Sequence, residues 1–164
     1  MKRRFVMTAF TASVMLSAVL AQDGQRIERF YFEGYRVVFV PSTVFKVKVA
    51  HPEMGRQETK GNSFALTIKE PNGRMPKDTV WVYTNALRNI SLNFSTIEMQ
   101  QPLTVDTLQV SATSSHGTVW VNAKKMEVSA KAGSHLVVKG KAHKLVCKTV
   151  GNGNSIDHNE LIEE

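Results

Sequence analysis

Between residues 90 and 149 the chain alternates apolar or small residues with polar ones in four short segments. These segments are Ile90–Phe94, Leu108–Ala112, Met126–Ala130 and Leu145–Thr149. A period of two is expected of a strand that buries one face. The first residues of the four segments are almost evenly spaced along the chain. A near-constant period of this size indicates a solenoid, in which each repeat buries its apolar face against its neighbours.

Each repeat carries two more columns of similar residues. A second strand follows the first, marked by apolar pairs such as Val119 and Val121, and a turn of small residues lies between the two strands. A third column stands three residues before each first strand and comprises Leu87, Val105, Ala123 and Ala142. The pattern predicts a single-stranded parallel β-helix, with equivalent positions stacked roughly 4.8 Å apart. An antiparallel sandwich is the alternative, since it also has many short alternating strands.

Residues 1–21 have the features of a secretory signal peptide. Three basic residues precede an apolar stretch, which ends at Val19-Leu20-Ala21, a sequence of the small-x-small type. This order predicts a leader over 1–21 that is cleaved after Ala21. An uncleaved anchor is the alternative, but the apolar run is short and rich in Thr and Ser. We therefore expect a domain over 22–164 that is exported to the periplasm, cell surface or medium and does not span the membrane after cleavage.

The exported domain divides into two parts. Residues 27–86 contain ordinary amphipathic strands and most of the aromatic residues, and we expect them to cap the first coil of the repeats in 87–164. Residues 51–61 are polar and are predicted to form one long loop, either a plain connection or a binding loop.

Three segments resemble a known family: Ser115–Val121, Leu136–Ala142 and Gly151–Asp157. They are similar to repeats of the GIN domain, also called the putative autotransporter adhesin head domain, and the resemblance runs from about residue 27 to 161. It implies a right-handed parallel β-helix in a protein of the bacterial envelope or a secreted protein. It implies no catalytic residue.

Lysines are concentrated in the last two repeats. The formal net charge is +7, and it falls to +4 without the leader, which holds three basic residues and no acidic one. Trp120, Lys124, Lys139 and Lys141 form the candidate ligand or partner surface, because alternation directs Trp120 outward beside the lysines. Such a surface could attract an acidic glycan or another envelope component. The alternatives are a solubilising lysine face and a Trp120 covered by the N-terminal strands. Nucleic acid is not expected as a partner.

No residue pattern indicates catalysis or a cofactor. Cys147 is the sole cysteine, so no internal disulfide can form, and its column predicts a small buried side chain. The five histidines lack metal-ligand spacing. In the predicted coils Asp106 and Asp157 lie roughly 14 Å apart, which gives no paired carboxylates of the kind that glycosidases need.

Three hypotheses follow for the function. The first is an exported, non-catalytic binding or adhesion-like module. The second is a structural module that self-associates by stacking through its coil end. The third, an enzyme that acts on polysaccharides, has the least support in the sequence.

Overall fold

The computed structural model of the chain describes residues 19–21, 26–69 and 78–163. These residues contain one 3₁₀ helix, η1 (Pro52–Met54), and thirteen strands. The strands are β1 (Val19–Ala21), β2 (Arg29–Glu33), β3 (Arg36–Pro41), β4 (Lys46–Val49), β5 (Gly55–Lys60), β6 (Ser63–Ile68), β7 (Thr79–Thr84), β8 (Asn89–Asn93), β9 (Thr96–Met99), β10 (Leu103–Thr113), β11 (His116–Lys131), β12 (His135–Val150) and β13 (Ser155–Glu163).

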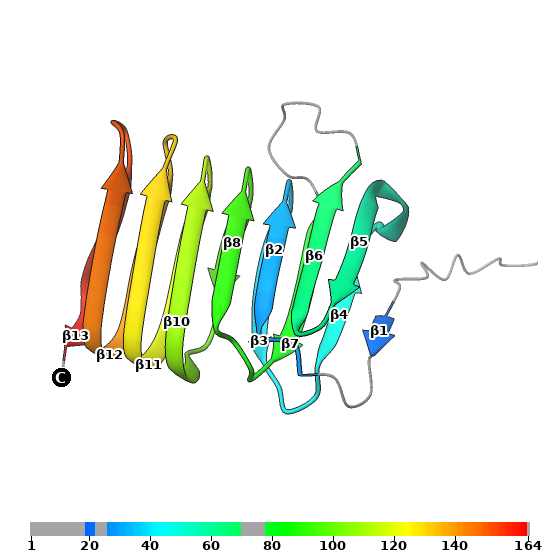
Figure 1. Cartoon of the computed structure of the whole chain (residues 1–164), viewed down its shortest axis with the longest axis horizontal. Coiled ribbons are helices and arrows are strands. Elements are labelled where there is room, and N and C mark those ends of the chain that lie inside the picture. Colours follow the sequence, from blue (N-terminus) through cyan, green and yellow to red (C-terminus); the bar gives the residue numbers. More distant parts are fainter. Residues whose placement is uncertain (1–18, 22–25, 70–77, 164) are drawn as a thin grey trace, which may run out of the picture.

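All thirteen strands belong to one sheet that folds over into a half-barrel of two facing layers (Figure 1). Its path runs β1-β4-β7-β3-β9-β11-β10-β8-β2-β6-β5, and β12 and β13 extend it beyond β11. The long strands β11 and β12 take part in both layers. Their first halves lie with β9, β3, β7, β4 and β13 in what we call the first layer. Their second halves lie with β10, β8, β2, β6 and β5 in the second layer.

The expectation of an all-β chain is correct, but the expected right-handed parallel β-helix is wrong. The sheet has mixed direction, since β1 with β4, β4 with β7, and β5 with β6 all pair antiparallel. One cause is a tight turn. Gly61, with φ of +56°, and Asn62 connect the paired residues Lys60 and Ser63. A two-residue connection joins antiparallel strands only, because parallel strands need a long crossover.

The N-terminal strands do not act as a lid over the repeats. They extend the two layers sideways: β2 pairs in parallel with β8 and β6, and β3 with β9 and β7. The predicted loop over 51–61 is also wrong, because it contains η1 and strand β5. Strand β5 is at the edge of the sheet and its residues are exposed or half-buried on both faces. It therefore lacks the apolar alternation by which a strand can be predicted.

Within residues 103–150 the repeats pair as parallel, in-register neighbours. Leu108 is opposite Met126, which is in turn opposite Leu145. Val105, Ala123 and Ala142 are aligned in the same way. The repeat spacing in the sequence therefore equals the length of chain that leads from one strand to the same point of the next.

A cluster of aromatic rings holds the two layers together. Phe30 of β2 and Phe39 of β3 lie in opposite layers, and their ring centroids are 5.6 Å apart in an edge-to-face arrangement. Phe32 and Phe64 also pack in this cluster and are almost fully buried. Burying each such ring contributes roughly 1.5–3 kcal/mol. The packing fixes the distance between the layers at the N-terminal end.

The predicted leader lies mostly outside the described residues. Its last three residues form β1, which pairs antiparallel with β4. Cleavage after Ala21 stays a prediction, and it would remove this edge strand.

Candidate functional site

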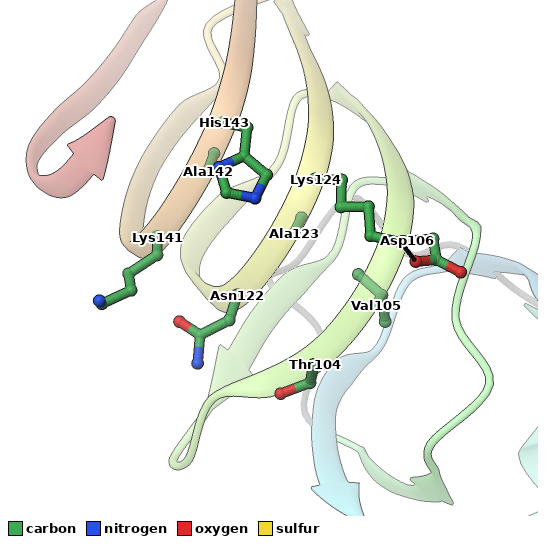
Figure 2. Close-up of a pocket in the computed structure, with 9 residues that line it drawn as sticks. All are labelled: Thr104, Val105, Asp106, Asn122, Ala123, Lys124, Lys141, Ala142 and His143. Atoms are coloured by element: carbon green, nitrogen blue, oxygen red, sulfur yellow. Dashed lines mark ion pairs between the residues drawn. The ribbon is translucent and has the colours of Figure 1, made fainter. Parts of the chain in front are cut away.

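A shallow trough crosses three parallel strands where the half-barrel bends from one layer into the other (Figure 2). Strands β10, β11 and β12 each contribute three consecutive residues, and the trough encloses about 330 Å³. We call it the corner trough, and its lining residues are Thr104, Val105, Asp106, Asn122, Ala123, Lys124, Lys141, Ala142 and His143.

The register of the strands arranges these residues in three rows. The middle row is Val105, Ala123 and Ala142, which are aligned across the strands and form the floor. The side chains of this row belong to the core or pack against it, so the floor lies lower than the polar rows on both sides. Ala123 and Ala142 are almost fully buried, so the half-buried Val105 offers most of the apolar surface that a ligand on the floor could cover.

Polar side chains form the two sides of the trough. One side is the aligned row Thr104, Asn122 and Lys141. The other side is Asp106, Lys124 and His143, at which the strands bend and the paired register is interrupted. The sides thus offer hydroxyl, amide, carboxylate, ammonium and imidazole groups, which include both hydrogen-bond donors and acceptors.

One ion pair sets the charge on the second side. The Lys124 Nζ is 2.7 Å from the Asp106 Oδ1, and both side chains are well exposed. The hydrogen bond from Lys124 lowers the pKa of the Asp106 carboxyl, and the same bond raises the pKa of Lys124. Both groups are therefore charged at neutral pH, and their charges largely cancel.

The predicted surface is only partly assembled in the structure. Lys124 and Lys141 line the corner trough, whereas Trp120 and Lys139 do not. Trp120 is half-buried and packs against the core, so it is neither fully outward nor fully covered. Its register neighbour Lys139 forms an ion pair of 2.8 Å with Glu160.

The predicted lysine face is broken up by carboxylates from the same strand and from neighbouring strands. Lys125 pairs with Glu127 at 2.6 Å, in addition to the pairs of Lys124 and Lys139 described above. Asp106 and Glu160 are far from their lysines along the chain, and only the sheet brings them together. The surface is consequently less basic than the sequence indicates.

Sequence reasoning missed four polar residues of the trough: Thr104 and Asn122 entirely, His143 as anything but one of five histidines without metal-ligand spacing, and Asp106 as anything but an isolated carboxylate. A usable signal was present. The column of Val105, Ala123 and Ala142 was recognisable, and its flanking residues on both sides are polar in every one of these three repeats. Small residues in a column with polar neighbours predict a lined groove.

The structure places two of the histidines and the cysteine in defined surroundings. His116 and His135 are register neighbours, but each ring contacts a hydroxyl: Thr96 Oγ1 at 3.2 Å and Ser155 Oγ at 2.8 Å. Among the described residues no group of three or more His, Cys, Asp or Glu could hold a metal ion. The expectation that Cys147 is buried is wrong. It aligns with the buried Val128, yet it is exposed because β13 ends its pairing with β12 before reaching it.

The fold and the trough define an all-β half-barrel domain with a polar surface site. The chain belongs to the family described as putative auto-transporter adhesin, head GIN domain, which matches residues 30–164. No curated protein matches the sequence.

Solved structures with the same fold come from species of Bacteroides and Parabacteroides. A putative adhesin from Bacteroides fragilis superposes with a TM-score of 0.72 at 13% identity, covering 88% of this chain and 71% of its own. A putative adhesin from Parabacteroides merdae gives 0.72 at 13%, covering 88% and 72%. A putative lipid binding protein from Parabacteroides distasonis gives 0.58 at 9%, covering 88% and 74%. At these identities the likeness concerns the fold alone. No helix in the described parts of the chain is long and apolar enough to cross a membrane.

Proposed function

We propose that this protein is a non-catalytic binding module of the cell envelope or exterior that holds a carbohydrate chain in the corner trough. The observation that carries the proposal is the combination of an apolar floor with sides that both donate and accept hydrogen bonds. The family description and the adhesin names of similar structures support an exported, adhesion-like role.

A sugar ring matches this chemistry on both counts. Its hydroxyl groups donate and accept hydrogen bonds, so they need partners of both kinds, and Asp106, Asn122 and Lys141 provide them. Its C–H face is apolar and can cover the half-buried Val105 of the floor. A trough over three strands is roughly 10 Å long from the strand spacing, which suits a short stretch of a linear glycan. The volume of about 330 Å³ lies near the lower end of small-molecule sites, about 300–1,000 Å³.

Charge argues against a strongly anionic ligand. Lys124 pairs with Asp106 and the lining holds one further lysine, so its formal net charge is small. A neutral or weakly acidic glycan therefore fits better than a polyanion. A lipid is disfavoured because an acyl chain has no use for the polar sides. Catalysis is disfavoured because Asp106 is the single carboxylate of the lining, and a glycosidase needs two.

The proposal can be tested by glycan-array screening of the exported protein, followed by calorimetry with the best ligand. Asn122→Ala removes a donor and an acceptor from one side and should weaken binding at least tenfold. Lys139→Ala is the matched control, because it removes a neighbouring lysine outside the trough and should leave the affinity unchanged. Both variants must retain the wild-type melting temperature to within a few degrees.

The salt dependence of the affinity distinguishes hydrogen bonding to a glycan from simple attraction between charges. Hydrogen bonding to a neutral glycan should change little between low and high ionic strength, whereas attraction between exposed charges is screened. Equal effects of the two variants, or binding that disappears at high salt, would contradict the proposal.

A further inference from the structure

We infer that two copies of this chain associate end to end through the open end of the half-barrel. The open end consists of residues 144–150 of β12 in the second layer and of β13 in the first layer. It is distinct from the carbohydrate proposal, since it uses different residues and a different partner.

The backbone at this end has unused pairing capacity. Strand β12 pairs with β11 over nearly its full length, but β13 covers only residues His135–Ala142. Residues 144–150 therefore have a paired strand on one side alone within the described chain. Strand β13 likewise pairs with β12 only. Each layer thus ends in a free strand edge, and such an edge is a template for pairing with another strand.

Apolar side chains are uncovered at the same end. Met126 and Val128 are buried, but the residues aligned with them on β12 are not: Leu145 is half-buried and Cys147 is exposed. Leu161 of β13 packs only partly against the core. The hydrophobic core thus reaches the end of the half-barrel without a covering layer. Uncovered apolar side chains gathered at one end of a domain are typical of a protein contact.

Charge identifies the partner as a second copy. The β12 part of the end carries Lys144 and Lys148, whereas β13 carries Asp157 and also Glu160, which is paired with Lys139. One end thus has a basic edge on one layer and an acidic edge on the other. A two-fold axis parallel to the strands would place the basic edge of each copy against the acidic edge of the other. A two-fold axis that places β12 of one copy beside β12 of the other would bring the lysines of the two copies together. The repulsion between their charges makes that arrangement unfavourable.

The register gives the pair that such a dimer would form. Lys148 is aligned with Ser129, and Asp157 with Val137. Ser129 and Val137 lie equally far from the turn at 132–134, so Lys148 and Asp157 are at the same height in their layers. The parallel two-fold axis preserves this height. It therefore brings Lys148 of each copy beside Asp157 of its partner, and the interface contains this pair twice.

The opposite end of the half-barrel does not offer an equivalent surface. In the second layer its edge strand is β5, which has the sequence Gly-Arg-Gln-Glu-Thr-Lys and two polar faces, and in the first layer its edge strand is β1, which pairs with β4. Charged edges oppose pairing between sheets. When each copy associates through one end only, the symmetry of the assembly is complete at two copies. The product is therefore a dimer and not a fibre.

Analytical ultracentrifugation of the exported full chain tests the inference. The wild-type protein should show a concentration-dependent monomer–dimer equilibrium. Lys148→Glu should raise the dimer dissociation constant at least tenfold, and Asp157→Lys should do the same. The double variant should recover most of the dimer, because both copies then carry the reversed pair. Lys60→Glu, the same charge change on β5 at the opposite end of the half-barrel, is the control and should have no effect.

Alkylation of Cys147 provides a second measurement that does not depend on variants. Its thiol should react quickly in dilute solution and at least several-fold more slowly at concentrations at which the dimer forms. A protein that stays monomeric at millimolar concentration overturns the inference, as does an unchanged alkylation rate. A dimer strengthened by Lys148→Glu overturns the proposed pairing, since it would mean that β12 faces β12.

Discussion

The Ser95 backbone N–H donates a hydrogen bond of 3.0 Å to the Ser115 Oγ, although the two residues are 20 positions apart. The same contact recurs one strand further on, where the Ser115 N–H donates to the Ser134 Oγ at 3.1 Å. The Ser134 N–H in turn donates to the Asn154 Oδ1 at 3.0 Å. The three serines are buried. This ladder satisfies backbone donors at the tight turns, where the chain passes between the layers and the sheet cannot pair them.

We predict that Ser115→Ala destabilises the protein by about 1–3 kcal/mol, because it leaves the buried Ser95 N–H without its acceptor. The variant also loses the bond that the Ser115 hydroxyl donates to the Thr113 carbonyl at 2.7 Å. Urea unfolding measures the change. Ser111→Ala is the control on the outer face of the same strand region and should shift the free energy of unfolding by less than about 0.5 kcal/mol. Equal effects of the two variants would show that the ladder contributes nothing.

Gly140 is predicted to tolerate no side chain. Its φ is +108°, and a Cβ there would lie 2.1 Å from the Val121 carbonyl oxygen of the adjoining strand. Since this oxygen belongs to the backbone, the strands must separate to admit the methyl group. Gly140→Ala should therefore cost several kcal/mol, or prevent folding, as shown by thermal unfolding and yield of folded protein.

Gly61 is the control for this prediction. It also has positive φ, +56°, but a Cβ there meets no atom within 4 Å. Asparagine adopts this left-handed conformation readily. Gly61→Asn should consequently leave the melting temperature nearly unchanged. A mild effect at Gly140 would mean that the strands are less closely spaced than described.

The comparison of sequence and structure shows which features a local pattern can reveal. Alternation reports which face of a strand is buried, so the register of Leu108, Met126 and Leu145 could be predicted. Strand β5 could not, because an edge strand with two polar faces has no alternation. The antiparallel pairs depend on turn geometry at Gly61 and on the order in which strands join the sheet, and neither is visible as periodicity.

The candidate site could be predicted only in part for a related reason. Lys124 and Lys141 stood out because lysines cluster along the chain. Asp106 did not stand out as a site residue, because its partner Lys124 lies one full repeat further along the chain. The two side chains meet only because their strands are neighbours in the sheet. Cys147 was placed in the correct column, but burial depends on a covering strand. Whether Cys147 is covered depends on how far β13 extends along β12, and the repeat pattern does not show this.

His51 is predicted to make stability fall as the pH rises above its ordinary pKa of 6.5. Its Nδ1 lies 2.9 Å from the Oδ1 of the buried Asp78. This hydrogen bond, followed by the charge of Asp78, raises the pKa of His51. A raised folded-state pKa gives stability that is fully present below about pH 6.5 and is lost as the pH rises through the folded-state value.

Two measurements check this prediction. NMR titration should give a pKa for His51 above its ordinary value, and His51→Gln should remove the corresponding pH dependence of the free energy of unfolding. His158→Gln, which replaces an exposed histidine of β13, is the control and should retain it. An unchanged pH profile in His51→Gln would mean that the pair with Asp78 does not form in solution.

Replacing Tyr35 with phenylalanine is predicted to preserve or increase stability. The Tyr35 side chain is fully buried, and its hydroxyl has no hydrogen-bond partner within the described parts of the chain. Tyr35→Phe removes a polar group that is buried without compensation, so the free energy of unfolding should stay equal or rise by about 1 kcal/mol. Urea unfolding at pH 7 measures this, and a loss of more than about 1 kcal/mol would reveal a partner for the hydroxyl.

The dependence of stability on alkaline pH is a second, independent test of the buried Tyr35 hydroxyl. Burial, with the nearby charges of Asp78 and Glu53, raises the pKa of Tyr35 to about 12. The unfolded chain loses this proton near the ordinary value of 10, so the folded state should lose stability between about pH 10 and 12. Tyr35→Phe should flatten that part of the profile, whereas Tyr83→Phe, at a half-buried tyrosine of β7, should leave it unchanged. Parallel profiles for the wild type and Tyr35→Phe would mean that the hydroxyl is hydrated, because water access would return its pKa towards the ordinary value.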